Sequence, residues 1–251
     1  MKKILAGVVC AAAVLAFTSC GTTKEAGAAG TAAAAGTGGD IPPALCMYTF
    51  EQPIEDGDIP DASGNELLGY AGGDGTLTDG KFGKAMVLNG SDCYVSLDES
   101  VFNSDEFTFA AWVKPDMWKD WARILDIGDG ASSDMWLGYA GVEHQLRLDV
   151  FGPQGAAVTL LAATPAAGQW THVAVTLGSG KASLYVNGNL IQQVPCTNKL
   201  SGFVHGQAYV GRSNWGADPL FTGAVDDIYV SAACASGKQI KAIMKGLPAA
   251  K

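Results

Sequence analysis

The chain has 251 residues, of which 48% are hydrophobic, and a formal net charge of −9 at neutral pH. This hydrophobic content suffices for a sizeable core, and the acidity argues against nucleic acid or densely anionic glycans as partners. The six cysteines include no Cys-x-x-Cys pair, and the three histidines lack metal-ligand spacing, so a structural zinc site is not expected.

Residues 1–19 have the pattern of an export signal. Lys2 and Lys3 precede an apolar run, residues 4–17, that is too short to span a bilayer, and two small residues then lead to Cys20. The pattern resembles a bacterial lipoprotein signal, which implies that Cys20 carries lipid after cleavage. The alternative is an ordinary secretory signal with Cys20 unmodified.

Residues 20–41 are rich in Ala, Gly and Thr and are predicted to be a flexible tether. The folded domain is expected over residues 42–246, with a short tail at 247–251. Lipid at Cys20 would place the protein in the bacterial cell envelope, at the outer membrane or cell surface, because Gly21 stands where inner-membrane retention commonly uses Asp. The lipid would be the protein's only contact with the membrane.

Alternating apolar residues predict that the domain is built from about a dozen strands. Trp170–Leu190 is the clearest segment, because Asn187-Gly188 between two alternating runs is typical of a type I′ hairpin turn. Residues 237–245 are the one expected helix. We therefore predict an all-β fold, a two-sheet antiparallel jelly-roll sandwich with a short C-terminal helix. The expected strands are 45–51, one near Leu67, 85–88, 93–97, 107–114, 123–127, 135–139, 146–151, 157–162, the two of the hairpin, 190–194, 207–211 and 225–230.

Several motifs in chain order resemble the LamG-like jelly rolls of the concanavalin A-like lectin/glucanase superfamily. They are 45–51, 61–65 (DASGN), 80–85 (GKFGKA), 88–95 (LNGSDCYV), 107–115, 170–188, 210–212 (VGR) and 223–230 (GAVDDIYV). The resemblance covers nearly the whole domain. It implies the concanavalin A-like fold strongly and a function weakly, because this scaffold carries sugar binders, adhesion modules, enzymes and spacers.

Four cysteines remain in the exported domain: Cys46, Cys93, Cys196 and Cys234. An even number in an exported protein favours two disulfides, and four cysteines allow three pairings. If the first and last strands are neighbours, Cys46–Cys234 is the natural pair and Cys93–Cys196 remains.

Relatives of this fold often hold one structural calcium ion near the first and last strands. On 225–230, Asp226 shares parity with Ile228, so its carboxylate is expected to point toward the packed layer, where it needs a cation or another partner. Asp226 is therefore the expected ligand, with Glu51 and the Gly90 carbonyl as further oxygens. The alternative is that Asp226 accepts hydrogen bonds from backbone amides or pairs with Lys or Arg.

A sugar site needs aromatic rings beside polar groups. Three tryptophans lie in turn-rich loops, where they either cover the core or contact a ligand: Trp118, Trp121 and Trp215. The other three are interpreted as structural residues of the scaffold: Trp112, Trp136 and Trp170. Arg147 and Asp149 face away from the core on their strand, and a plain surface ion pair is the alternative. If the loops converge, the site comprises Trp118, Trp121, His144, Arg147, Asp149, Arg212 and Trp215.

No catalytic constellation is recognised. No strand carries the closely spaced acidic residues of the superfamily's glucanases, and Asp126 with Asp129, or Asp149 alone, does not fit that pattern. We therefore expect a membrane-anchored, non-catalytic binding module, with carbohydrate as its ligand. One alternative is a cell-envelope adhesion or scaffolding protein that binds another surface protein. A degenerate glycan-active enzyme is the second.

Overall fold

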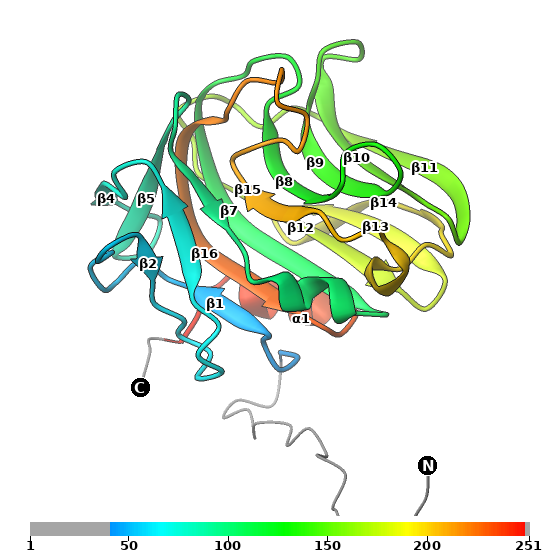
Figure 1. The fold of residues 1–251 in the computed structure, drawn as a ribbon, viewed down its shortest axis with the longest axis horizontal. Coiled ribbons are helices and arrows are strands. Elements are labelled where there is room, and N and C mark those ends of the chain that lie inside the picture. Colours follow the sequence, from blue (N-terminus) through cyan, green and yellow to red (C-terminus); the bar gives the residue numbers. More distant parts are fainter. Residues whose placement is uncertain (1–40, 249–251) are drawn as a thin grey trace, which may run out of the picture. The chain divides into compact units, whose positions relative to one another are not determined.

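The structure, a computed structural model, describes residues 41–248, so the signal, Cys20, most of the tether and the last three residues lie outside it. Two antiparallel sheets face each other and enclose the core, as Figure 1 shows. The expected two-sheet antiparallel sandwich is therefore confirmed. Within residues 41–248, no helix has the length and apolarity needed to cross a membrane.

Sheet A has eight strands, in the order β14–β13–β12–β7–β16–β5–β4, with β1 paired to β16. First and last strands are therefore neighbours. The Asn187-Gly188 turn joins β13 to β14 with positive φ at both residues, as a type I′ turn requires. The strands are β1 (Cys46–Tyr48), β4 (Leu77–Asp79), β5 (Lys84–Asn89), β7 (Phe107–Met117), β12 (Thr171–Gly178), β13 (Lys181–Val186), β14 (Asn189–Pro195) and β16 (Thr222–Ser231).

Sheet B also has eight strands, in the order β11–β10–β9–β8–β15–β6–β3–β2. The short β2 of this sheet and β4 of sheet A were not expected from the sequence, because neither is long enough to show alternation. The strands are β2 (Asp58–Ile59), β3 (Gly69–Gly72), β6 (Tyr94–Ser96), β8 (Arg123–Gly128), β9 (Asp134–Ala140), β10 (Gln145–Gly152), β11 (Gly155–Ala162) and β15 (Gln207–Val210).

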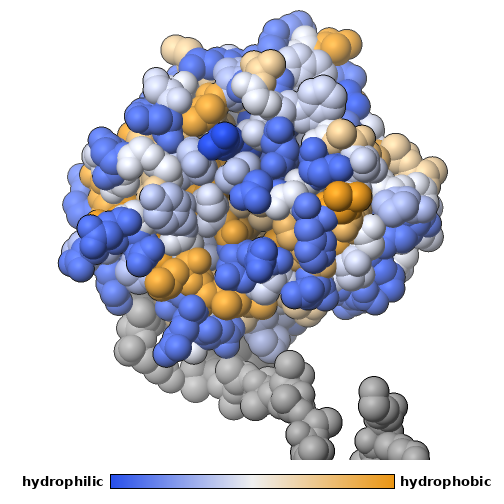
Figure 2. Space-filling view, viewed as in Figure 1, coloured by the Kyte–Doolittle hydropathy of each residue, from blue (hydrophilic) through white to orange (hydrophobic). Residues whose placement is uncertain are grey.

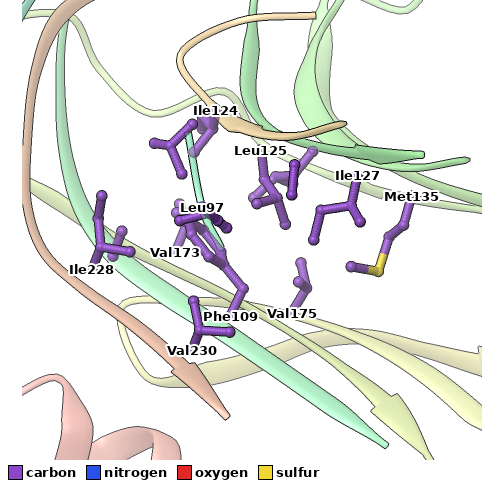
Figure 3. Packing of buried hydrophobic residues seen from close by; sticks show 14 of the residues in the cluster. Leu97, Phe109, Ile124, Leu125, Ile127, Met135, Val173, Val175, Ile228 and Val230 are labelled. Carbon is purple, nitrogen blue, oxygen red and sulfur yellow. The ribbon is translucent and has the colours of Figure 1, made fainter. Parts of the chain in front are cut away.

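The main core lies between the sheets. Leu125, Ile127 and Met135 of sheet B meet Phe109 and Val175 of sheet A, and all are almost fully buried (Figure 3). Alternate residues of each strand point to the opposite, outer face, because strand side chains alternate. The core thus fixes which side chains of sheet B point outward.

Helix α1 (Gly237–Ile243) covers part of the outer face of sheet A. Its Ile240 and Ile243 pack with Tyr185 and Tyr229 in a second apolar cluster. Ser236 begins the helix with a capping box, in which it accepts from the Gln239 backbone N–H. Two 3-10 turns complete the elements, η1 (Glu99–Asn103) and η2 (Leu200–Gly202).

The predicted orientation of Asp226 is wrong because β16 contains a bulge. Opposite β7, the register shifts between Asp226 and Tyr229, and Asp227 there has a left-handed φ of 47°. Asp226 therefore pairs with Trp112 on the outer face, whereas Val225 and Ile228 enter the core. Both aspartates are nonetheless buried.

Candidate functional site

The outer face of sheet B carries an unusual number of polar and aromatic side chains. Neighbouring positions such as Leu125, Leu137 and Leu148 belong to the core, so Asp126, Trp136 and the residues beside them on this face point away from it. Loop 211–221, between β15 and β16, lies over the centre of this face and is closed at its base by a bond from Phe221 N to Gly211 O. Figure 2 shows the molecule in the orientation of Figure 1, with hydrophobic residues scattered among hydrophilic ones on the visible surface.

Two arginines hold Trp136 between them on β8–β10. The Arg123 guanidinium lies 4.0 Å from the ring centroid of Trp136, and that of Arg147 lies 5.5 Å from it. The ring of Trp121 meets Trp136 edge-on at 6.2 Å. Such cation–π contacts orient the guanidinium groups and leave their edges for hydrogen bonds.

Each of these arginines is paired with carboxylates. Arg147 contacts Glu143 at 3.0 Å and Asp149 at 2.8 Å, and these carboxylates raise the pKa of Arg147 despite its partial burial. The buried Arg123 contacts Asp126 at 3.2 Å and Asp218 of loop 211–221 at 3.0 Å. Arg123 therefore ties the loop to the sheet.

Asp126 and Asp134 form a buried carboxyl pair beneath the loop. Asp126 accepts from Arg123 Nε and from Nδ2 of Asn214, at 2.6 Å. Both carboxyl oxygens of Asp134 are buried and receive no hydrogen bond from a donor group in residues 41–248. Burial first, and then the charge of Asp126, raise the pKa of Asp134. Burial raises the pKa of Asp126 as well, but Arg123 and Asn214 donate to its charged form, so the proton between the two carboxyl groups lies on Asp134.

Three tyrosines form a second group on the same face, across β3, β6 and β15; we call Tyr70, Tyr94 and Tyr209 the tyrosine patch. Tyr70 is 53% exposed, and Tyr94 and Tyr209 are half-buried and meet edge-on at 5.3 Å. Ser96 pairs with Tyr70 on one side and with Tyr209 on the other. A hydroxyl thus lies among three aromatic rings.

Two glycines allow two of these rings to lie against the sheet. A Cβ on Gly72 would stand 2.1 Å from the Tyr94 ring, and one on Gly57 would stand 2.6 Å from the Tyr70 ring. Real Cβ atoms do not approach so closely, so a larger residue at either position would displace the ring. The two glycines therefore determine how closely the Tyr94 and Tyr70 rings approach the sheet.

The residues expected to form the sugar site come together only in part. Trp121, Arg147 and Asp149 lie with Trp136, while Arg212 lies 4.6 Å from the Tyr94 ring and 5.0 Å from that of Tyr209. Trp215 is 55% exposed on loop 211–221 and leans on Gly130 in the loop between β8 and β9.

Two expected residues lie apart from these groups. Trp118 stacks on Tyr139 and packs edge-on against Phe221, and its indole N–H donates to Pro165 O at 2.7 Å. It therefore covers the core instead of facing a ligand. His144 is exposed at the β9–β10 turn, where it bonds to the Tyr139 hydroxyl.

The expected calcium ligands do not form one coordination shell. Asp226 accepts from the backbone N–H groups of Phe82 and Asp227, and Glu51 accepts from that of Lys84. Gly90 lies beside Thr222, four residues along β16 from Asp226, which corresponds to about 13 Å. No group of three or more His, Cys, Asp or Glu suited to a metal occurs in residues 41–248. The two carboxylates thus hold the 80–84 turn, and this ligand set does not fit a calcium ion.

The predicted disulfides do not form in the structure, where all four described cysteines are free thiols. Cys46 faces the core from β1, whereas Cys234 lies past the end of β16, beside Gly178. Cys93 lies beside Asp74, and Cys196 lines a pocket of about 390 Å³ at the β12–β13 turn. Adjacent first and last strands were therefore not enough to bring Cys46 and Cys234 together.

Comparison with known proteins agrees with this architecture. A family model described as the concanavalin A-like lectin/glucanases superfamily matches residues 89–241, more than half of the chain. The chain belongs to this superfamily. No curated protein sequence matches it.

Solved structures share the concanavalin A-like fold at low identity. Domain 4 of AbnA, an extracellular arabinanase from Geobacillus stearothermophilus in complex with arabinotriose, is 22% identical with a TM-score of 0.68, over 80% of this chain and 98% of that domain. The binding domain of botulinum neurotoxin DC, in complex with rat synaptotagmin II, is 15% identical with a TM-score of 0.58, over 81% of this chain. The match spans 51% of the toxin domain. At these identities the similarity shows the fold alone.

Several residues of this concanavalin A-like face were not singled out from the sequence. Arg123 and Asp134 begin β8 and β9 at positions as buried as the core positions of these strands, and Trp136 was interpreted as scaffold. Tyr94 and Tyr209 did carry a signal, since each alternates with core residues on a short strand. Charged or aromatic residues at outward positions of adjacent strands would have located the face.

Proposed function

We propose that this protein is a membrane-anchored, non-catalytic module that binds carbohydrate through the outer face of sheet B. The tyrosine patch is the observation that carries the proposal. Aromatic rings that lie against a sheet offer flat apolar surfaces to the C–H faces of sugar rings, and nearby polar groups can bond to the hydroxyls. Ser96 and Gln207 supply such groups beside Tyr209.

The second group on the face supports the same proposal. Arg123 and Arg147 are already held by carboxylates and by Trp136, so a ligand that contacts them does not incur the entropic cost of ordering their side chains. Loop 211–221 is likewise fixed through Asn214 and Asp218. Because the similar arabinanase domain was solved in complex with arabinotriose, arabinotriose is the first oligosaccharide to test.

Hydrolysis is not part of the proposal. The carboxyl pair of Asp126 and Asp134 on this face is at most 1% exposed and lies beneath Asn214. General acid catalysis requires contact with the glycosidic oxygen, and a buried pair cannot make this contact.

Tyr70→Ala tests the binding site directly. Because Tyr70 is the most exposed ring of the patch, its loss is expected to weaken oligosaccharide binding about tenfold, through an aromatic contact worth roughly 1–1.5 kcal/mol. Isothermal titration calorimetry with arabinotriose and with neutral and acidic oligosaccharides measures the affinity. Leu190→Ala, which removes a similarly exposed apolar side chain from β14 of sheet A, is the control and should bind as the wild type does. No binding to any oligosaccharide would contradict the function and favour a protein partner.

We also propose that Cys20 carries lipid and holds the domain at the bacterial envelope. The support is the charged start, the short apolar run and the small residues before Cys20 in the sequence. Expression with radiolabelled palmitate in bacteria should label the wild type, and Cys20→Ser should abolish the label and move the protein from the membrane fraction to the soluble one. Equal labelling of both proteins would rule out Cys20 as the attachment point.

A further inference from the structure

All three arginines of the chain, Arg123, Arg147 and Arg212, lie on the outer face of sheet B. Arg123 and Arg147 are each paired with two carboxylates. Arg212 differs, because in residues 41–248 no carboxylate lies within ion-pair distance of it. A guanidinium without a counter-charge is notable in a chain of net charge −9.

The geometry of Arg212 keeps its hydrogen-bond donors available. Its guanidinium lies over the rings of Tyr94 and Tyr209, at 4.6 and 5.0 Å from their centroids. Within residues 41–248 none of the Arg212 N–H groups donates a hydrogen bond, so these donors are available to a ligand. The two rings thus hold Arg212 in place without using its donors, and the residue is half-buried at the side of the tyrosine patch.

The ligand group that suits this edge is a carboxylate. Two parallel N–H groups of an arginine match the two oxygens of a carboxylate, and such charge-assisted pairs are the strongest hydrogen bonds between side chains. The chain's net charge of −9 disfavours a densely anionic polymer, which favours a glycan with isolated acidic sugars. The adjacent rings favour a sugar over an acidic peptide, because the exposed ring of Tyr70 lies in the same row as the Ser96 hydroxyl.

We propose that Arg212 binds the carboxylate of an acidic sugar, so that the protein selects glycans that carry a uronic acid or a similar residue. This inference rests on the proposed glycan-binding function and names the ligand class for the same face. The sugar ring would lie on the tyrosine patch while its carboxylate bonds to the edge of Arg212.

The test uses pairs of oligosaccharides that are identical except for a terminal glucuronic acid or glucose, with calorimetry at low and at physiological salt. The wild type is expected to bind the acidic member about ten- to a hundredfold more tightly. Arg212→Gln should remove this preference. Arg212→Lys, which keeps the charge without the planar fork, should retain only part of the preference. Lys181→Gln removes the same charge from an exposed position on β13 of sheet A and should retain all of it.

The outcomes separate this inference from the function on which it rests. Equal binding of both oligosaccharides by the wild type would overturn the role of Arg212 and leave glycan binding intact. A preference that persists in Arg212→Gln, in a sample with the wild-type circular dichroism spectrum, would also overturn it. Binding of neither oligosaccharide would contradict the proposed function itself, and tight binding of an acidic peptide instead would contradict both.

Discussion

Replacing Arg123 with methionine is expected to lower the free energy of unfolding by about 3–5 kcal/mol. Methionine nearly fills the volume of the arginine but leaves Asp126 buried without its cation and Asp218 without its partner in the sheet. The substitution also removes the stacking on Trp136 and the bond from Nη1 to Trp121 O. Urea denaturation followed by tryptophan fluorescence measures the change.

Arg147→Met is the matched control for Arg123→Met. The Arg147 side chain is 21% exposed, against 5% for Arg123, so water screens its pairs with Glu143 and Asp149. A loss of about 1 kcal/mol is expected for this variant. Equal losses for the two variants, or a loss below about 1 kcal/mol for Arg123→Met, would show that the network does not hold loop 211–221 on the sheet.

Asp134→Asn is expected to make the protein more stable than the wild type at alkaline pH. Burial and the neighbouring Asp126 raise the pKa of Asp134 to about 9, whereas an unfolded aspartate titrates near about 4. Between these values the folded state binds the extra proton, so wild-type stability falls as pH rises. Asparagine keeps the neutral form at every pH, and its N–H group can replace the proton shared with Asp126.

The comparison of the two proteins isolates the coupled pair Asp126 and Asp134 from the other groups that titrate. Asp226 and Asp227 have pKa values raised to about 7 and 6 and act in the same direction, while His172, lowered to about 4, acts in the opposite one. All three are present in both proteins, so they cancel in the difference. Urea denaturation from pH 5 to pH 9 should show a difference that grows by up to about 1.4 kcal/mol per pH unit. Parallel curves would mean that Asp134 is already ionised at pH 5.

The fold was largely predictable because local pattern and long-range packing agree in it. The hairpin at Asn187-Gly188 and the helix after Ser236 depend on turn and cap chemistry that the sequence shows directly. The orientation of Asp226 could not be predicted, because a single bulge residue, Asp227, reverses the alternation that the prediction assumed. A bulge depends on how β16 pairs with the neighbouring strand β7, and the sequence of β16 alone does not specify this pairing.

The candidate site was less predictable than the fold. Arg147 and Asp149 were recognised because their neighbours on β10 are plainly core residues. Tyr70 was not, since it lies on a four-residue strand and owes its position to Gly57 on a different segment. Trp118 belongs to a loop whose packing on Tyr139 depends on the sheet order. The position of a side chain that depends on residues far along the chain cannot be predicted from the local sequence pattern.

The most direct test of glycan binding on the outer face of sheet B is a crystal structure with the tightest-binding oligosaccharide of the calorimetric panel. The account predicts a sugar ring over Tyr70, at the edge of the tyrosine patch, with a polar contact to Arg212. Sugar bound instead on the outer face of sheet A or in the pocket beside Cys196, with none on the tyrosine patch, would contradict it.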